Sequence, residues 1–336
     1  MLIALVYLGP NTPKYVFKNL LHIKNHFPKQ DLVFISDSVR SVKKCSKLGI
    51  KAWLFQDDMK ESDRLKKHSS LPMDFRNGFW YSTTARFFAL EAFLAENPNS
   101  QVIQFESDVW LAPNFPFSKF DELDRDIDIA FPLETEFTGA ASVLYIRDAR
   151  AAKAFCFETR KIMLSQEDAT DMTILGQLHK ESSVKCLILP SLPPHSPGIN
   201  PGVNQETEQL ITANTDYFGG VFDAVTYGLY LMGEDPRNHR GKLVRFRRQE
   251  GHLVHCDKMK FESDPDSIRI INQESTPLFN IHIHSKSQIA WTVRFMNGVL
   301  PNIIRESHQG VSSKRNYPLT FILAFKSLKR RIGLGV

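Results

Sequence analysis

The stretch Leu2-Ile3-Ala4-Leu5-Val6-Tyr7-Leu8 decides the fold, because an unbroken run without charges is typical of a strand buried on both faces. It is followed by Thr12 and Pro13, a pair that often begins a helix, since the first helical residue needs no free N–H. Further apolar runs at residues 32–36 and 50–55 flank a second helical pattern. This order predicts an α/β fold with parallel strands and right-handed crossovers.

The residues that directly follow these strands are candidates for a binding site. In open sheets of this kind, ligands sit outside the carboxyl ends of the strands. Tyr7, Gly9, Asn11 and Asp37 occupy such positions. We therefore expect these four residues to bind part of a ligand.

The charge balance is mild. The formal net charge of +5 is spread along the chain, except for a dense cluster of Lys326, Lys329, Arg330 and Arg331. Such a balance suits an anionic small molecule or an anionic membrane surface, and we predict no nucleic-acid partner. The apolar and then basic segment at residues 317–332 is either an interfacial helix that contacts a membrane or a helix that packs on the domain.

The cysteines indicate a reducing environment. Cys45, Cys156, Cys186 and Cys256 are widely separated and form no Cys-x-x-Cys, so neither a metal–thiolate site nor a disulfide framework is expected. The apolar start has no basic leader or small-residue cleavage site, and no stretch reaches the roughly 18 apolar residues that a spanning helix needs. We predict a cytoplasmic protein, with peripheral membrane contact through the segment above.

An acidic pair lies in an otherwise apolar segment. Residues 102–111 read Val-Ile-Gln-Phe-Glu-Ser-Asp-Val-Trp-Leu and predict one strand that carries Glu106 and Asp108. Charge there is costly unless a positive group balances it. At this spacing both carboxylates would point to one face and could share Mg²⁺ or Mn²⁺. The alternative is a strand that ends in a salt-bridged turn, and pairs such as Asp124 and Asp126 show that the spacing alone is weak.

The segment Ala85-Arg86-Phe87-Phe88-Ala89-Leu90, followed by Glu-Ser-Asp at residues 106–108, resembles the donor-binding half of GT-A type glycosyltransferases, which carry an Asp-x-Asp motif at this point. The resemblance implies a Rossmann-like, mixed and mainly parallel sheet flanked by helices, with Mn²⁺ or Mg²⁺ at the motif. Glu106 departs from the motif by one methylene, so Asp108 is the better ligand. Arg86 would reach the donor diphosphate or stabilise the motif; the alternative is an ordinary surface arginine.

A second matching segment lies late in the chain. Residues 279–286 alternate apolar and polar, which predicts a strand with His282, His284 and Lys286 on one face. The resemblance implies that a histidine here completes the metal shell and that a basic residue holds the leaving phosphates. We favour His284 as the ligand, with His282 second, and Lys286 as the phosphate contact.

Three further carboxylates are catalytic candidates. Asp168 and Asp171 precede an apolar helix, and the resemblance implies an acidic residue at such a helix start, facing the acceptor. The alternative is that Asp168 is the N-cap and Asp171 lies in the first turn. Asp223 is expected either to cap the helix that begins near residue 222 or to orient an acceptor hydroxyl.

These inferences predict a hexosyltransferase-like glycosyltransferase in surface glycan or polysaccharide synthesis. It would move a sugar from a nucleotide-diphosphate sugar to a hydroxyl of a glycan or lipid-linked acceptor. The expected division is a nucleotide-sugar-binding half at 1–115, an acceptor-binding half at 116–290 that holds the metal-site strand, and a helical basic tail at 291–336.

Two alternatives remain open. A nucleotidyltransferase shares the strand–helix alternation, but it normally has a glycine-rich, basic loop where this chain has Gly9-Pro10-Asn11-Thr12-Pro13. The other alternative is a non-catalytic carbohydrate-binding protein with a degenerate transferase fold.

Overall fold

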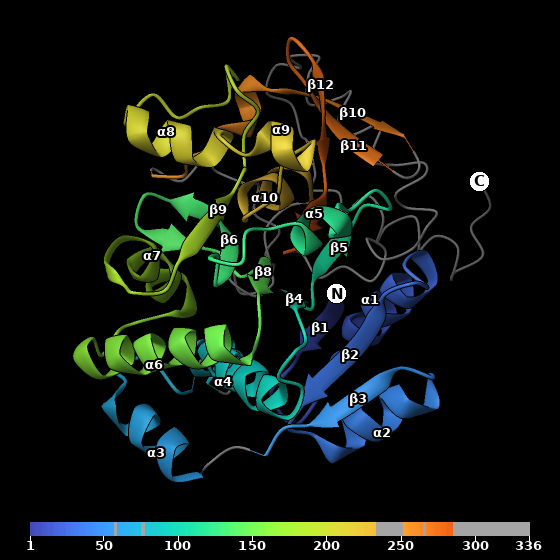
Figure 1. Cartoon of the computed structure of the whole chain (residues 1–336), viewed down its shortest axis with the longest axis vertical. Helices are drawn as coiled ribbons and strands as arrows, with labels where there is room; N and C mark the ends of the chain where they lie inside the picture. Colours follow the sequence, from blue (N-terminus) through green and yellow to red (C-terminus); the bar gives the residue numbers. More distant parts are fainter. Residues whose placement is uncertain (57–58, 75–77, 233–250, 265–266, 285–336) are drawn as a thin grey trace, which may run out of the picture.

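The central sheet consists of β3 (Lys51–Leu54), β2 (Asp31–Ser36), β1 (Leu2–Val6), β4 (Val102–Phe105), β8 (Val143–Ile146), β6 (Ile129–Thr135) and β7 (Thr138–Gly139), in that order, with β9 (Cys186–Leu189) alongside β6 (Figure 1). Strands β1 to β4 are parallel, whereas β8 is antiparallel to both β4 and β6. The predicted α/β fold with a mixed, mainly parallel sheet is therefore confirmed.

The computed structural model describes residues 1–56, 59–74, 78–232, 251–264 and 267–284. Lys286, the predicted tail at 291–336 and the predicted membrane-contact segment at 317–332 lie outside these residues. No helix in the described ranges has the length and apolar character needed to cross a membrane. Strands on both sides of the predicted boundary at residue 115 belong to the same sheet, and the division into halves stays a prediction.

Helices cover both faces of the sheet, and alternating side chains of β1 show how. Leu2, Ala4 and Val6 belong to the core cluster that includes the inner sides of α4, α6 and α7. Ile3 and Leu5 belong to the opposite cluster, with α1 and the short helix α5. The helices that flank the sheet are α1 (Lys14–His26), α2 (Val39–Lys47), α3 (Met59–His68), α4 (Phe79–Glu96), α5 (Phe117–Asp121), α6 (Ala149–Ser165) and α7 (Asp171–Glu181).

The remaining elements form a second layer at one end of the sheet (Figure 1). A small antiparallel sheet of three strands packs there, and a separate pair of strands, β5 and β13, joins distant parts of the chain. These elements are β5 (Val109–Leu111), α8 (Gln205–Thr212), α9 (Thr215–Phe218), α10 (Thr226–Met232), β10 (Lys260–Asp264), β11 (Ser267–Ile271), β12 (Ser275–Leu278) and β13 (Asn280–His282).

The order of the strands reverses between β1 and β4. The chain moves outward from β1 to β2 and β3, then returns to place β4 on the other side of β1. Leu5 of β1 lies opposite Phe105 of β4, so the two strands end at the same edge of the sheet. In open α/β sheets, such a reversal leaves a crevice at the carboxyl ends of the strands where ligands bind.

The prediction of one continuous strand at residues 102–111 is wrong. Strand β4 ends at Phe105, residues 106–108 form a turn, and β5 leaves the main sheet to pair with β13. The Val109 N–H donates to the Glu106 carbonyl at 3.0 Å, which closes the turn. Glu106 and Asp108 are therefore brought together by a turn and not by the alternation of an extended strand.

An aromatic cluster packs beside this turn and supports the later segments of the chain. The Phe222 ring lies 5.1 Å from Phe279 and 5.9 Å from Phe120, between ring centroids. Phe222 precedes Asp223, and Phe279 precedes Asn280, which begins β13. The cluster therefore fixes two backbone segments that lead into the candidate site.

Truncation of this cluster tests its contribution. Phe120 is fully buried and lies against the Phe115, Phe218 and Phe222 rings, so we expect Phe120→Ala to lower the free energy of unfolding by about 3–5 kcal/mol. Phe157→Ala is the matched control, because that side chain is 63% exposed on α6 and should change stability by less than about 0.5 kcal/mol. Urea unfolding followed by circular dichroism measures the stability of both variants. Equal losses of unfolding free energy would contradict a stabilising role of the aromatic cluster.

Candidate metal centre

Strand pairing brings together three side chains that are far apart in the sequence. Glu106 and Asp108 lie on the turn after β4, and His282 ends β13. Because β13 runs antiparallel to β5, His282 lies opposite Val109, directly beside the turn. The ligand atoms of Glu106, Asp108 and His282 all lie within 4.8 Å of one another. They form a candidate metal centre.

The distances at this centre suit a small divalent cation. The His282 Nε2 lies 3.2 Å from Glu106 Oε2 and 3.3 Å from Asp108 Oδ1. An octahedral Mg²⁺ with ligands at about 2.1 Å holds neighbouring ligand atoms about 3 Å apart, which is close to both distances from His282. Without a metal, a protonated His282 would donate hydrogen bonds to both carboxylates in the same arrangement. Titration with a metal ion distinguishes the metal-bound centre from this hydrogen-bonded, metal-free one.

Arg86 connects this centre to α7. Its guanidinium lies 2.6 Å from Glu106 Oε1 and also forms an ion pair with Asp171. Arg86 is only 7% exposed, so the interpretation as a surface arginine is wrong. Burial opposes its charge, but the carboxylates of Glu106 and Asp171 outweigh burial and raise the pKa of Arg86. The guanidinium thus holds one oxygen of Glu106 while the other faces His282.

Asp171 is fixed by its position at the start of α7. Thr170 caps this helix through its side chain, so the prediction that Asp168 is the N-cap is wrong, and Asp171 lies in the first turn as expected. Burial raises the pKa of the Asp171 carboxyl, and repulsion by Glu106 adds to this, while Arg86 opposes both. The ion pair with Arg86 therefore gives Asp171 a positioning role.

Asp223 supports the backbone at His282. It is fully buried, and one carboxylate oxygen accepts from the Gly228 and His282 N–H groups at 2.8 Å while the other accepts from Tyr227 at 3.0 Å. Burial raises the pKa of Asp223 to about 6, although these hydrogen bonds oppose the rise. The expected helix start near residue 222 is wrong, since α10 begins at Thr226, but the carboxylate does bind amides of its first turn.

Two buried asparagines that the sequence analysis missed complete the support. Asn19 of α1 donates to the carbonyls of Ser107 and Val109, at 3.1 and 2.9 Å, and so fixes the turn that carries both carboxylates. Asn280 exchanges two hydrogen bonds with the backbone of Asp223. Asn19 lies on the buried, apolar side of α1. A polar residue at such a position is the one feature of the sequence that could have indicated its supporting role.

The residues predicted to follow β1 and β2 lie at the same sheet edge as the candidate metal centre. The Gly9 N–H donates to Asp37 Oδ1 at 2.8 Å, so Asp37 braces the loop that contains Tyr7 and Asn11. Gly9 has φ of +129°, which a side chain would disfavour. Because β1 pairs with β4, this loop lies next to the turn that carries Glu106.

The structure places the two late histidines differently from the predicted order. His282 belongs to the three-residue cluster, whereas His284 stacks on the His282 ring with centroids 3.9 Å apart. Asp168 is exposed and lines a separate pocket beside α7. Lys286 follows the described residues, so its phosphate contact stays a prediction.

Comparisons with known proteins give only a distant likeness. No protein-family profile matches the chain, and no curated protein has a similar sequence. An active-site mutant of the galactosyltransferase LgtC is 14% identical over 67% of this chain and 85% of its own, with a TM-score of 0.43. Mouse xyloside xylosyltransferase 1 is 13% identical over 56% of this chain and 84% of its own, with a TM-score of 0.35. A CMP:2-keto-3-deoxy-manno-octonic acid synthetase in complex with CTP is 10% identical over 57% of this chain and 91% of its own, with a TM-score of 0.32.

Glycosyltransferases are thus among the structural neighbours, beside a synthetase whose structure contains CTP. These TM-scores are all below 0.5, so the function is inferred from the residues of the site.

Gly228 provides a test of how α10 supports the centre. A Cβ at Gly228 would lie 1.9 Å from the His282 carbonyl oxygen, so Gly228→Ala must push α10 and β13 apart. We expect a loss of about 1–3 kcal/mol in unfolding free energy, together with weaker Mn²⁺ binding, because His282 moves. In the control Gly202→Ala, the nearest atom is the Asn200 Oδ1 at 3.5 Å, and stability should be unchanged. Thermal unfolding measures the stability of both variants, and Mn²⁺ titration measures their metal binding. Wild-type stability and Mn²⁺ affinity in Gly228→Ala would refute the idea that α10 supports the metal centre through His282.

Replacement of Arg86 tests the buried ion-pair network. Arg86→Met leaves the Glu106 and Asp171 carboxylates without their partner. It should lower the free energy of unfolding by about 3–5 kcal/mol. Lys185→Met removes the exposed ion pair with Asp126 and should cost no more than about 1 kcal/mol. Adding Asp171→Leu to Arg86→Met should recover part of the loss, as measured by urea unfolding. A double variant less stable than Arg86→Met alone would contradict the ion-pair role.

Proposed function

We propose that the protein is a metal-dependent glycosyltransferase that moves a sugar from a nucleotide-diphosphate sugar to a hydroxyl of a glycan or lipid-linked acceptor. One observation carries the proposal: Glu106, Asp108 and His282 converge at the carboxyl end of β4, where the strand order reverses. Ligands of open α/β sheets bind at such a reversal. A role in surface glycan or polysaccharide synthesis and a cytoplasmic location would accompany this activity.

The charges around the centre favour a divalent cation. When ionised, Glu106, Asp108 and Asp171 carry three negative charges, whereas Arg86 carries one positive charge and a protonated His282 would carry a second, so negative charge stays in excess in this group. Buried charge of one sign is costly unless it is paired. Glu106, Asp108 and His282 would hold Mn²⁺ or Mg²⁺, and His282 replaces His284 as the first choice. Such an ion, when bound, neutralises a diphosphate as it leaves the sugar.

The loop after β1 is the proposed site for the nucleotide. Tyr7, Gly9 and Asn11 follow the strand that lies beside β4, and Asp37 holds the loop through the Gly9 amide. A base bound there would place its diphosphate toward the Glu106–Asp108 turn. Both terminal nitrogens of the Arg86 guanidinium already contact carboxylates, so Arg86 would position Glu106 more than it would contact phosphate. Lys286 remains the proposed phosphate contact.

The acceptor would approach from the side of α7. Of the three predicted catalytic carboxylates, Asp171 and Asp223 are buried and engaged by Arg86 and by backbone amides respectively. Asp168 is exposed at the loop before α7. An exposed carboxylate can meet an acceptor hydroxyl, so Asp168 is the proposed acceptor-side residue and the other two position the centre.

A product assay discriminates this proposal from the alternatives. The full chain is incubated with a panel of nucleotide-diphosphate sugars, with Mn²⁺ or with EDTA, and released nucleoside diphosphate is measured. Metal-dependent release supports a glycosyltransferase. Pyrophosphate release from nucleoside triphosphate and sugar phosphate would show a nucleotidyltransferase instead, and sugar binding without either product would show a non-catalytic module.

Variants of the ligands test the metal centre directly. Asp108→Asn and His282→Gln should each weaken Mn²⁺ binding by more than about 100-fold, because even outer-shell changes cost 10–100-fold. The control is Asp126→Asn, since Asp124 and Asp126 form an acidic pair of equal spacing whose Asp126 side chain is 77% exposed. Electron paramagnetic resonance of Mn²⁺ measures binding. Wild-type affinity in Asp108→Asn would refute the metal centre.

A further inference from the structure

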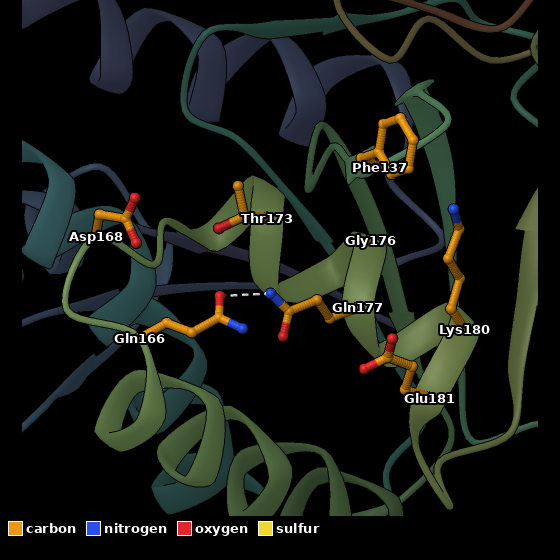
Figure 2. A pocket seen from close by; sticks show the side chains of 8 residues that line it. All are labelled: Phe137, Gln166, Asp168, Thr173, Gly176, Gln177, Lys180 and Glu181. Atoms are coloured by element: carbon orange, nitrogen blue, oxygen red, sulfur yellow. Dashed lines mark hydrogen bonds between the residues drawn. The ribbon is translucent and has the colours of Figure 1, made fainter.

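A pocket lies beside α7, apart from the candidate metal centre (Figure 2). It is an open pocket with a volume of about 380 Å³, lined by α7, the loop before it and the turn between β6 and β7. None of its lining residues belongs to the cluster of Glu106, Asp108 and His282. Its size is at the lower end of the usual range for small-molecule sites, roughly 300–1,000 Å³.

One wall of the pocket is an exposed aromatic ring on a fixed support. Phe137 is 69% exposed, yet its backbone lies against α7 so closely that a Cβ at Gly176 would meet the Phe137 carbonyl oxygen at 1.9 Å. The hydroxyls of Thr135 and Thr138 share a hydrogen bond of 2.6 Å across the same turn. The Lys180 ammonium lies 4.3 Å from the ring centroid, over one face. The turn therefore holds the Phe137 backbone in place and presents the ring as an apolar surface open to a ligand.

The other walls carry planar groups that can both donate and accept hydrogen bonds. The Gln177 side-chain amide donates to the Gln166 oxygen at 2.6 Å (Figure 2), which orients the two amides. This bond leaves the Gln166 amide nitrogen as a donor and the Gln177 oxygen as an acceptor. Asp168 and Glu181 add carboxylate acceptors at the two ends of the pocket. Hydroxyl groups, which donate and accept at once, match this set.

The charge of the pocket selects among hydroxyl-rich ligands. Asp168 and Glu181 are negative, and Lys180 is the single positive residue in the lining. The ammonium of Lys180 is directed at the Phe137 ring. The net negative charge disfavours phosphates, nucleotides and acidic sugars. An uncharged sugar, with polar edges and an apolar face for the ring, fits both the charge and the chemistry.

Helix α7 links this pocket to the candidate metal centre. Asp171 at its start contacts Arg86 and lies in the same helix as Lys180. Nine residues at about 1.5 Å each separate these positions by roughly 14 Å along the helix. We propose that the pocket binds a short segment of an uncharged glycan, and that this glycan is the acceptor chain. The acceptor assignment rests on the proposed function, whereas glycan binding by the pocket does not.

The binding experiment uses the full chain in EDTA, without donor. Saturation-transfer NMR is recorded with neutral di- and trisaccharides built from glucose, galactose and N-acetylglucosamine, and with sulfated and uronic-acid saccharides. We expect a neutral saccharide to bind, and Phe137→Ala to weaken its binding by about tenfold. Gln177→Ala should also weaken it. Phe157→Ala, which removes another exposed phenylalanine, should bind normally.

The outcomes separate the pocket from the catalytic proposal. Failure of every neutral saccharide to bind at millimolar concentration, normal binding by Phe137→Ala, or a preference for the anionic saccharides or for peptides would each overturn the glycan site. Neutral binding without metal-dependent donor turnover would keep the glycan site and remove the acceptor assignment. If turnover is found, Phe137→Ala should raise the acceptor KM about tenfold with a smaller change in kcat, and an unchanged KM would overturn the assignment.

Discussion

The buried guanidinium of Arg86 is the contact on which the candidate metal centre depends. It joins α4, the turn after β4 and the start of α7, because Glu106 and Asp171 both bind it. Even with a protonated His282, Arg86 cannot balance three ionised carboxylates, and a low-dielectric interior makes that imbalance costly. The fold therefore both assembles the carboxylates and leaves a charge that a cation would satisfy. This imbalance links the packing of α4 to the chemistry proposed for the protein.

The early part of the fold could be predicted because its signals are local. The apolar run at β1, the helix start at Pro13 and the later short strands all follow from periodicity. The turn at residues 106–108 could not, since the apolar pattern continues from β4 into β5 without a glycine or proline. That break arises from the pairing of β5 with β13, about 170 residues later, and such pairing leaves no local signature.

The candidate site was predicted in its chemistry and not in its geometry. Glu106, Asp108 and a late histidine were found by residue type, but the choice between His282 and His284 depends on where β13 ends. Asp223 lies at that end, and its carboxylate accepts a hydrogen bond from the His282 amide. Likewise Asn19 is visible only as a polar residue on an apolar helix face. These supporting roles are tertiary, because each joins elements that are distant in the sequence.

The candidate metal centre and the pocket beside α7 both have an excess of negative charge, but burial gives the excess opposite consequences. In the centre, Asp108 and Asp171 are shielded from water, so their charge must be paired within the protein or by an ion. In the pocket, Asp168 and Glu181 are exposed, and water and salt screen them over about 8–10 Å. Screened carboxylates accept hydrogen bonds from hydroxyl groups without needing a cation. One protein can therefore present a site for a metal with its phosphates and a separate site for an uncharged sugar, and α7 connects them through the ion pair of Asp171 with Arg86.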